Sequence, residues 1–197
     1  MFWDAASLVY DVFARGINRS VNRRLCAEVA ALTRGAADVL ECACGTGMLT
    51  EAMAPGCGRI VATDYSAGML RRARRKCRRL ANVTFRRGNI LRLDFPSGSF
   101  DAVVAGNVLH LLDDPRQALA ELLRVCRPGG RVILPTYVLT GKRGLFMHLT
   151  DKFSAHFKRR YTPDTYRRFF EEAGHMDGQY LLIEGRLPCA VAILPAP

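Results

Sequence analysis

Short apolar segments alternate with helix-like segments along most of this 197-residue chain. The clearest example is Asp38-Val39-Leu40-Glu41-Cys42, which leads within a few residues into Gly45-Thr46-Gly47. A short apolar run that enters a glycine turn and is followed by a helical pattern is typical of a βαβ unit. Repetition of this unit predicts a mostly parallel sheet with helices on both faces.

The pattern predicts seven strands. They cover residues 38–42, 59–64, 82–87, 100–106, 131–137, 179–184 and 189–194, with helices expected over residues 46–54, 66–80, 115–126, 144–160 and 163–173. Only Gly185-Arg186-Leu187-Pro188 separates the last two strands, which is too short for a parallel crossover. The expected fold is therefore an α/β, Rossmann-like, doubly wound and mostly parallel seven-stranded sheet with an antiparallel C-terminal strand hairpin at its edge.

The length of the chain fits one domain, and no linker interrupts it. Residues from about Ser7 to Leu32 mix apolar and basic positions at helical spacing, with a break near Gly16. We therefore expect an N-terminal helical lid over residues 1–35 and a Rossmann-like core over residues 36–197.

The cysteines and the hydropathy pattern predict a cytoplasmic protein without a metal site. The number of cysteines is seven, and most of them lie in apolar segments, so a disulfide framework is not expected. Cys42 and Cys44 lack a second pair at zinc-site spacing. No apolar run is long enough to cross a membrane, and the first residues, Met1-Phe2-Trp3-Asp4, do not resemble a signal peptide.

A formal net charge of +11 raises the question of an anionic partner such as RNA, acidic lipid or an acidic substrate. Much of the charge lies in one predicted helix and the strand after it, at Arg71, Arg72, Arg74, Arg75, Lys76, Arg78, Arg79, Arg86 and Arg87. This stretch has no interleaved aromatic residues for stacking on bases. Nucleic acid is therefore the less favoured partner, and a solvated basic surface is the simpler interpretation.

The glycine turn and an acidic residue at the end of the next strand predict a nucleoside ligand. Gly45 and Gly47 allow a sharp turn and a close approach of a ligand to the backbone. Asp64 ends the second strand, where a carboxylate can accept hydrogen bonds from both hydroxyls of a ribose. Each feature alone also fits an ordinary turn or helix cap. Thr50 stands where a dinucleotide site has its third glycine, which argues against a pyrophosphate.

Four segments together resemble the motifs of class I S-adenosylmethionine-dependent methyltransferases. They are Val39-Leu40-Glu41-Cys42-Ala43-Cys44-Gly45-Thr46-Gly47, Ala62-Thr63-Asp64-Tyr65-Ser66-Ala67-Gly68-Met69-Leu70, Phe95-Pro96-Ser97-Gly98-Ser99-Phe100-Asp101-Ala102-Val103-Val104, and Leu123-Arg124-Val125-Cys126-Arg127-Pro128-Gly129-Gly130. Their order and spacing also match over about residues 36–137. The similarity is greatest to the small-molecule branch of the family that resembles enzymes of ubiquinone and menaquinone biosynthesis.

The resemblance implies S-adenosylmethionine as the cofactor, S-adenosylhomocysteine as its product, and no metal. Glu41 and the backbone of residues 44–47 would hold the methionine part, and Asp64 would hold the ribose. Tyr65 would lie beside the adenine, and Asn89, where the family usually has Asp, would meet the adenine edge. The implied cofactor-binding residues are Tyr10, Glu41, Cys42, Ala43, Cys44, Gly45, Gly47, Asp64, Tyr65, Ser66, Met69, Asn89, Ile90 and Ala105.

Methyl transfer is an in-line attack on a sulfonium methyl group, so alignment and exclusion of water are the main requirements. Asn107 and His110 are the candidate catalytic residues, because both follow the fourth strand and the unperturbed pKa of a histidine suits a general base. The alternative for His110 is a structural role in Leu109-His110-Leu111-Leu112. Trp3, Tyr10 and Asp11 would cover the cofactor, or simply pack on the sheet.

Three functions are consistent with these residues. The first is a methyltransferase acting on a small molecule, as a monomer or homodimer and without membrane insertion. The second is an RNA or protein methyltransferase that docks through the basic helix of residues 71–79. The third is a non-catalytic protein that binds the cofactor.

Overall fold

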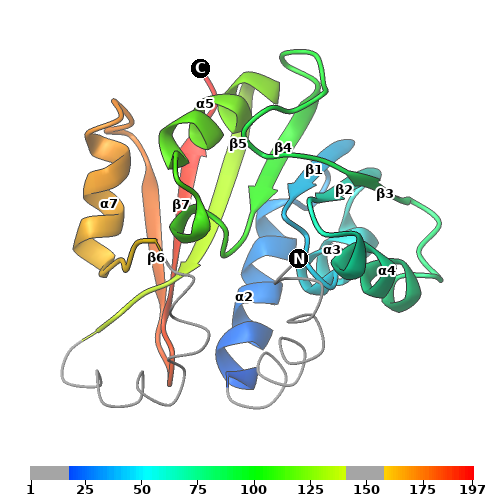
Figure 1. The fold of residues 1–197 in the computed structure, drawn as a ribbon, viewed down its shortest axis with the longest axis horizontal. Coiled ribbons are helices and arrows are strands. Elements are labelled where there is room, and N and C mark those ends of the chain that lie inside the picture. The colour runs from blue at the N-terminus through cyan, green and yellow to red at the C-terminus, as the bar shows by residue number, and fades with distance from the viewer. Residues whose placement is uncertain (1–17, 141–157) are drawn as a thin grey trace.

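Seven strands form one mixed sheet in the order β3-β2-β1-β4-β5-β7-β6 (Figure 1). The computed structural model describes residues 18–140 and 158–197. The strands are β1 Asp38–Cys42, β2 Arg59–Asp64, β3 Val83–Arg87, β4 Phe100–Ala105, β5 Cys126–Tyr137, β6 Gln179–Ile183 and β7 Cys189–Pro195. β1 to β5 are mutually parallel, and β7 pairs antiparallel with both β5 and β6. The predicted fold class and the C-terminal hairpin are confirmed.

Helices cover both faces of the sheet. They are α2 Arg19–Leu32, α3 Met48–Met53, α4 Ala67–Lys76, α5 Pro115–Val125 and α7 Pro163–Glu171, with short 3-10 helices η1 Ala54–Gly56 and η2 Leu109–Leu111. The apolar sides of α2, α3 and α4 pack on one face, and those of α5 and α7 pack on the other (Figure 1). Every one of these helices shares a buried cluster with the strands, so the sheet is the centre of the core.

The strands in the middle of the sheet are apolar on both sides, as a parallel sheet covered by helices requires. In β1, Val39 faces the α2–α4 side and Leu40 faces the α5–α7 side, and both are fully buried. The edge strands β3 and β6 are largely exposed. This difference places β1 and β4, which pair with each other, at the buried centre.

Two predicted boundaries are wrong. The helix expected to reach Leu80 ends at Lys76, because the chain passes into a turn in which the Leu80 amide bonds to the Cys77 carbonyl. The strand expected to begin at Arg131 begins at Cys126, directly after α5. Cys126 pairs with Phe100, and a shift of register between Phe100 and Ala102 absorbs the glycines within the strand as a bulge.

Several helix starts follow the sequence signals. The Ser66 side chain accepts a hydrogen bond from the Met69 amide and caps α4, as predicted. Thr162 and Thr165 form a capping box at the start of α7. The helical region expected over residues 144–160 lies largely outside the described residues, and so does the N-terminal part of the expected lid.

Two tyrosines near α7 provide a matched test of a buried hydrogen bond. The Tyr166 hydroxyl is buried and donates to the Leu134 carbonyl at 2.9 Å. The Tyr180 hydroxyl is also buried but has no partner among the described residues. Tyr166→Phe should lower the free energy of unfolding by about 1–2 kcal/mol, because it leaves a buried carbonyl with one donor fewer. Tyr180→Phe should cost less than half of that, and urea unfolding of both variants measures the difference. Equal losses of unfolding free energy in the two variants would show that the Tyr166 hydrogen bond adds nothing to stability.

Candidate active site

The order of the strands reverses between β1 and β4. The chain moves outward from β1 to β2 and β3 in one direction, and from β4 to β5 in the other. The helix after β1 lies on one face of the sheet and the helix after β4 lies on the opposite face. Their connecting loops therefore separate at the carboxyl ends of the strands. Ligands of open α/β sheets bind at such a point.

The backbone is strained at the two loops that flank this point. Ala43 follows β1 with a φ of 52°, and Asn107 follows β4 with a φ of 54°. They are the only non-glycine residues with positive φ in the described parts of the chain. Gly45 and Gly47, with φ of 56° and 81°, alternate with Ala43 in the same loop. Such conformations cluster at ligand sites, where the surrounding structure holds them in place.

The Asp64 carboxylate joins the loop after β1 to the loop after β2. Its Oδ2 accepts a hydrogen bond from the Gly45 amide at 2.8 Å, and its Oδ1 accepts one from the Ser66 amide at 2.8 Å. A carboxylate offers about four acceptor positions, and these two amides occupy two of them. The two sequence features that predict a nucleoside, the glycine turn and Asp64, are thus in direct contact.

Other amides of the loop after β1 are used inside the protein. The Cys44 amide bonds to the Thr63 carbonyl, and the Gly47 amide bonds to the Cys44 carbonyl, both at 2.9 Å. A Cβ on Gly47 would lie 3.2 Å from both the Ala73 Cβ and the Cys77 Sγ. The loop therefore lies tightly against α4, and only glycine combines this contact with a positive φ.

Glu41 is a buried carboxyl group beneath the loop. It is 2% exposed and accepts a hydrogen bond from the Thr50 hydroxyl. Burial raises the pKa of Glu41 to about 8; the Thr50 hydrogen bond opposes this shift and the negative charge of Asp64 adds to it. Glu41 is thus mostly protonated at neutral pH until a cation or donor approaches it.

The loops after β2 and β3 lie next to each other. The Gly88 amide bonds to the Asp64 carbonyl at 3.2 Å. Tyr65 is 54% exposed, and the Arg87 guanidinium lies 5.1 Å from the centre of its ring. Asn89 is exposed, and its Oδ1 accepts a hydrogen bond from the Leu91 amide at 3.0 Å, whereas Ile90 is buried.

Asn107 connects the ends of β4 and β5. Its amide bonds to the Pro135 carbonyl at 2.8 Å, and its side-chain Oδ1 accepts a hydrogen bond from the Tyr137 amide at 3.0 Å. Ala105 is the last residue of β4, is buried, and pairs with Cys42 of β1. These bonds give Asn107 a structural role at the place where the strand order reverses between β1 and β4.

His110 lies on η2 and is 6% exposed. Its Nδ1 is 3.2 Å from the Thr136 Oγ1, and its carbonyl accepts hydrogen bonds from the Lys158 and Arg159 amides. Burial lowers the pKa of His110 to about 4, which makes its imidazole a weak base. His110 thus ties η2 to the segment that begins at residue 158.

The predicted cofactor-binding residues lie at or near the carboxyl ends of β1, β2, β3 and β4, apart from Tyr10, which lies outside the described residues. Glu41, Cys42 and Ala105 stand on the strands themselves, and Met69 is buried in the first turn of α4. Burial raises the pKa of the Cys42 thiol to about 12. In the described ranges, no three His, Cys, Asp or Glu side chains are grouped to hold a metal ion.

Three contacts of this region were not predicted from the sequence. They are the Thr50 hydroxyl on Glu41, the Arg87 guanidinium over Tyr65, and the Asn107 side chain on the Tyr137 amide. Each joins residues from different strands or loops. Only Thr50 gave a usable signal, since it lies one helical turn after the glycine turn, on the predicted helix.

Known proteins share both the sequence pattern and the fold. Residues 40–134 match the family described as methyltransferase domain. A demethylmenaquinone methyltransferase of Renibacterium salmoninarum is 36% identical over 140 residues, which cover 70% of this chain and 57% of that protein. This chain belongs to the class I S-adenosylmethionine-dependent methyltransferases. The chain spans little more than half the length of this relative.

Solved structures agree on the fold of this methyltransferase family. The N-methyltransferase NodS of Bradyrhizobium japonicum, solved with S-adenosylhomocysteine, has a TM-score of 0.70 at 19% identity, covering 89% of this chain and 87% of NodS. The [4+2]-cyclase SpnF has a TM-score of 0.71 at 19% identity, covering 88% of this chain and 81% of SpnF. The fold therefore does not by itself define the reaction. No helix in the described ranges has the length and apolar character needed to span a bilayer.

The raised pKa of Glu41 predicts a pH-dependent stability. The carboxyl is protonated up to about pH 8 in the folded protein but only to about pH 4.5 when unfolded. Its contribution to stability is therefore complete below pH 4.5 and is lost as the pH rises through 8. Relative to Glu41→Gln, the wild type should lose roughly 1 kcal/mol of unfolding free energy per pH unit in this window. Urea unfolding from pH 5 to 8 measures the loss.

Glu28→Gln is the matched control, because Glu28 is exposed on α2. Its unfolding free energy should follow the wild type at every pH. A constant difference between wild type and Glu41→Gln over the same range would show that Glu41 ionises normally.

Proposed function

We propose that this chain binds S-adenosylmethionine at the carboxyl ends of β1, β2 and β4 and transfers its methyl group to a small-molecule acceptor. The observation that carries the proposal is the double hydrogen bond of Asp64 to the loops after β1 and β2. It holds a carboxylate, suited to ribose hydroxyls, directly against a glycine turn that a ligand can approach.

In this proposal each part of the cofactor has its own surface. Asp64 accepts hydrogen bonds from the ribose hydroxyls, and the exposed ring of Tyr65 lies beside the adenine, with Asn89 and Ile90 at the adenine edge. Glu41 and the loop after β1 receive the methionine part. The ammonium group of the methionine, next to the buried Glu41 carboxyl, would favour its ionised form and release a proton on binding.

The reaction needs alignment more than acid–base chemistry. The sulfonium carries a positive charge that disappears as the methyl group leaves, so the departing thioether needs no stabilisation. Among the described residues of η2 and its loop, His110 has a lowered pKa and a buried ring. We therefore propose a positioning role for His110 and Asn107 and an acceptor that needs no strong base.

A small-molecule acceptor is supported by the relative that is named a demethylmenaquinone methyltransferase. The reacting group of the acceptor would approach from the carboxyl ends of β4 and β5. The ribose would lie on the β1–β2 side of the place where the strand order reverses. The link of His110 to residues 158 and 159 brings the chain back to this edge. The acceptor therefore lies, in this proposal, between η2 and the segment that precedes α7.

The ribose contact can be tested with a single substitution. Asp64→Asn keeps the shape of the side chain but loses its charge and one of its two acceptor oxygens. It should weaken binding of S-adenosylhomocysteine by about tenfold or more, as expected for loss of charge-assisted hydrogen bonds. Isothermal titration calorimetry measures the affinity. Asp94→Asn, at a fully exposed carboxylate, should bind like the wild type. If both variants bind equally well, Asp64 does not hold the ribose.

The acceptor class can be tested by following the labelled methyl group. The protein is incubated with methyl-labelled cofactor and, separately, demethylmenaquinone, a metabolite extract, or total RNA. Mass spectrometry should find the label on a small molecule in the first or second reaction. Labelling of RNA alone would contradict the proposed acceptor class, and tight cofactor binding without any labelled product would favour a non-catalytic role.

A further inference from the structure

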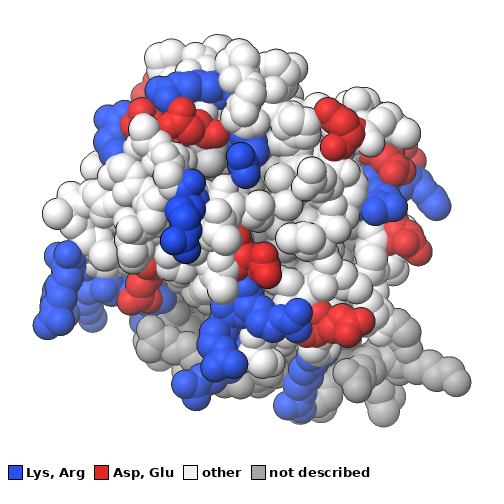
Figure 2. All heavy atoms as spheres, turned by 180° about the vertical axis from the view of Figure 1, so that it is seen from behind, with Lys and Arg blue, Asp and Glu red and all other residues white. Residues whose placement is uncertain are grey.

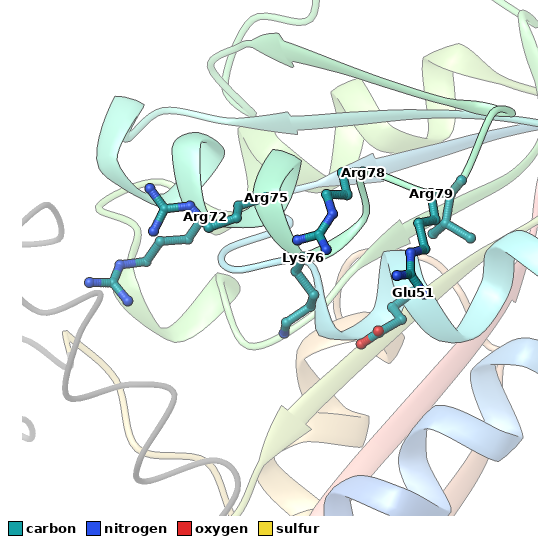
Figure 3. A pocket seen from close by; sticks show the side chains of 7 residues that line it. Glu51, Arg72, Arg75, Lys76, Arg78 and Arg79 are labelled. Carbon is teal, nitrogen blue, oxygen red and sulfur yellow. The ribbon is translucent and has the colours of Figure 1, made fainter.

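A basic hollow lies between α3 and the C-terminal half of α4. Its volume is about 590 Å³, and it is lined by Glu51, Arg72, Arg75, Lys76, Arg78, Arg79 and Leu80 (Figure 3). None of the predicted cofactor-binding or catalytic residues belongs to the lining. We call this feature the basic hollow.

The packing of α4 forces its cations to one side. Met69, Leu70, Ala73 and Cys77 are buried and fix the apolar face of the helix. The remaining positions are almost all basic, so like charges fall four residues apart, as at Arg71 and Arg75 or Arg72 and Lys76. Such pairs destabilise a helix, and their position near its C-terminus offsets only part of this repulsion.

Four of these cations are not engaged in an ion pair in the described parts of the chain. No ion pair or hydrogen bond joins the side chains of Arg75, Lys76, Arg78 or Arg79 to another described residue. Glu51 is the single carboxylate of the lining, and it stands on α3 across from Lys76 (Figure 3).

Some arginines elsewhere in the molecule do have partners. Arg127 pairs with both Asp38 and Asp101, and Arg59 also pairs with Asp38. Arg74, on the other side of α4, donates to the Phe85 carbonyl at 2.9 Å. The basic hollow thus brings together four cations that form no ion pair with a described residue.

We propose that the basic hollow binds a compact, soluble anion that carries two or more phosphate groups. Guanidinium groups bind phosphate oxygens through paired hydrogen bonds, and an ammonium group acts as a point charge on the same oxygens. The four positive charges from one helix end and its following turn exceed the charge of about −2 that a single phosphate group carries at neutral pH. A short chain of phosphates fills the hollow and removes the repulsion along α4.

The surroundings of the hollow favour this ligand over RNA. Binding of single-stranded nucleic acid combines a continuous basic track with aromatic side chains for stacking. The lining contains no aromatic residue, and Tyr65 precedes the opposite end of α4, beneath Arg87. On the face shown in Figure 2, neutral and acidic side chains interrupt the basic ones, so this face carries no continuous track.

The same features argue against a membrane surface. Helices that bind bilayers insert an apolar face below the headgroups. The apolar face of α4 is packed against the sheet, and Leu80 is the only aliphatic residue in the lining. A concave site also suits a small ligand better than a flat bilayer. A volume of about 590 Å³ lies within the range of roughly 300–1,000 Å³ that small-molecule sites occupy.

Two double variants with the same loss of charge test the proposal. Arg75→Gln/Arg79→Gln removes two cations of the hollow. Arg23→Gln/Arg24→Gln removes two exposed arginines of α2 and serves as the control. Inorganic tripolyphosphate is titrated into the wild type and both variants in a calorimeter, with and without excess S-adenosylhomocysteine, which keeps the anion out of the candidate active site.

The wild type should bind one tripolyphosphate. The hollow variant should bind it at least about tenfold more weakly, since charge-assisted bonds are lost, and the control should stay within about twofold of wild type. Tripolyphosphate should also raise the unfolding temperature of the wild type and the control more than that of the hollow variant, because a ligand of the folded state stabilises it.

Equal affinity of the two double variants for tripolyphosphate would overturn the proposal, because net charge alone would then explain binding. So would absence of tripolyphosphate binding combined with Arg75- and Arg79-dependent binding of an RNA oligonucleotide or of vesicles containing phosphatidylglycerol. Failure of S-adenosylhomocysteine to bind would count against the proposed function only, since the titration without it still tests the hollow.

Discussion

The Asp64 carboxylate is the contact on which the candidate site depends, because it joins loops that follow two different strands. One oxygen holds the Gly45 amide and the other holds the Ser66 amide, while the Asp64 carbonyl receives the Gly88 amide. A single residue thus sets the relative position of the loops after β1, β2 and β3. Parallel pairing places the carboxyl ends of these strands at one edge, and Asp64 fixes how their loops meet there.

Three residues beside the buried centre of the sheet are in energetically unfavourable states. Ala43 and Asn107 adopt left-handed backbone conformations at the ends of β1 and β4, and Glu41 is a carboxyl group in an apolar environment. Each of these features costs free energy when considered alone. Dense packing of the strands around them keeps the loops in place, so a ligand meets a prepared surface rather than a flexible one.

Charged side chains are paired in one part of this molecule and unpaired in another. At the amino edge of the sheet, arginine and aspartate side chains neutralise one another across β1, β4 and β5. At the C-terminal end of α4, Arg75 and Lys76, with Arg78 and Arg79 of the following turn, form no ion pair with a described residue, and Glu51 is the single carboxylate in the lining of the basic hollow. Part of the high net positive charge of the chain is therefore concentrated at the basic hollow.

The sequence by itself determined the succession of strands and helices, the glycine turn and the acidic end of β2, because these depend on local periodicity and on residues close together in the chain. Its errors concern where an element begins or ends: α4 stops at a turn in which Cys77 also contacts the distant Gly47 carbonyl, and the glycine bulge in β5 depends on pairing with β4. Only the tertiary structure decided that Asp64 bonds to Gly45, that Glu41 is buried under Thr50, and that His110 has a lowered pKa. Burial and hydrogen bonding depend on which segments pack together, and a pattern of residues along the chain does not contain that information.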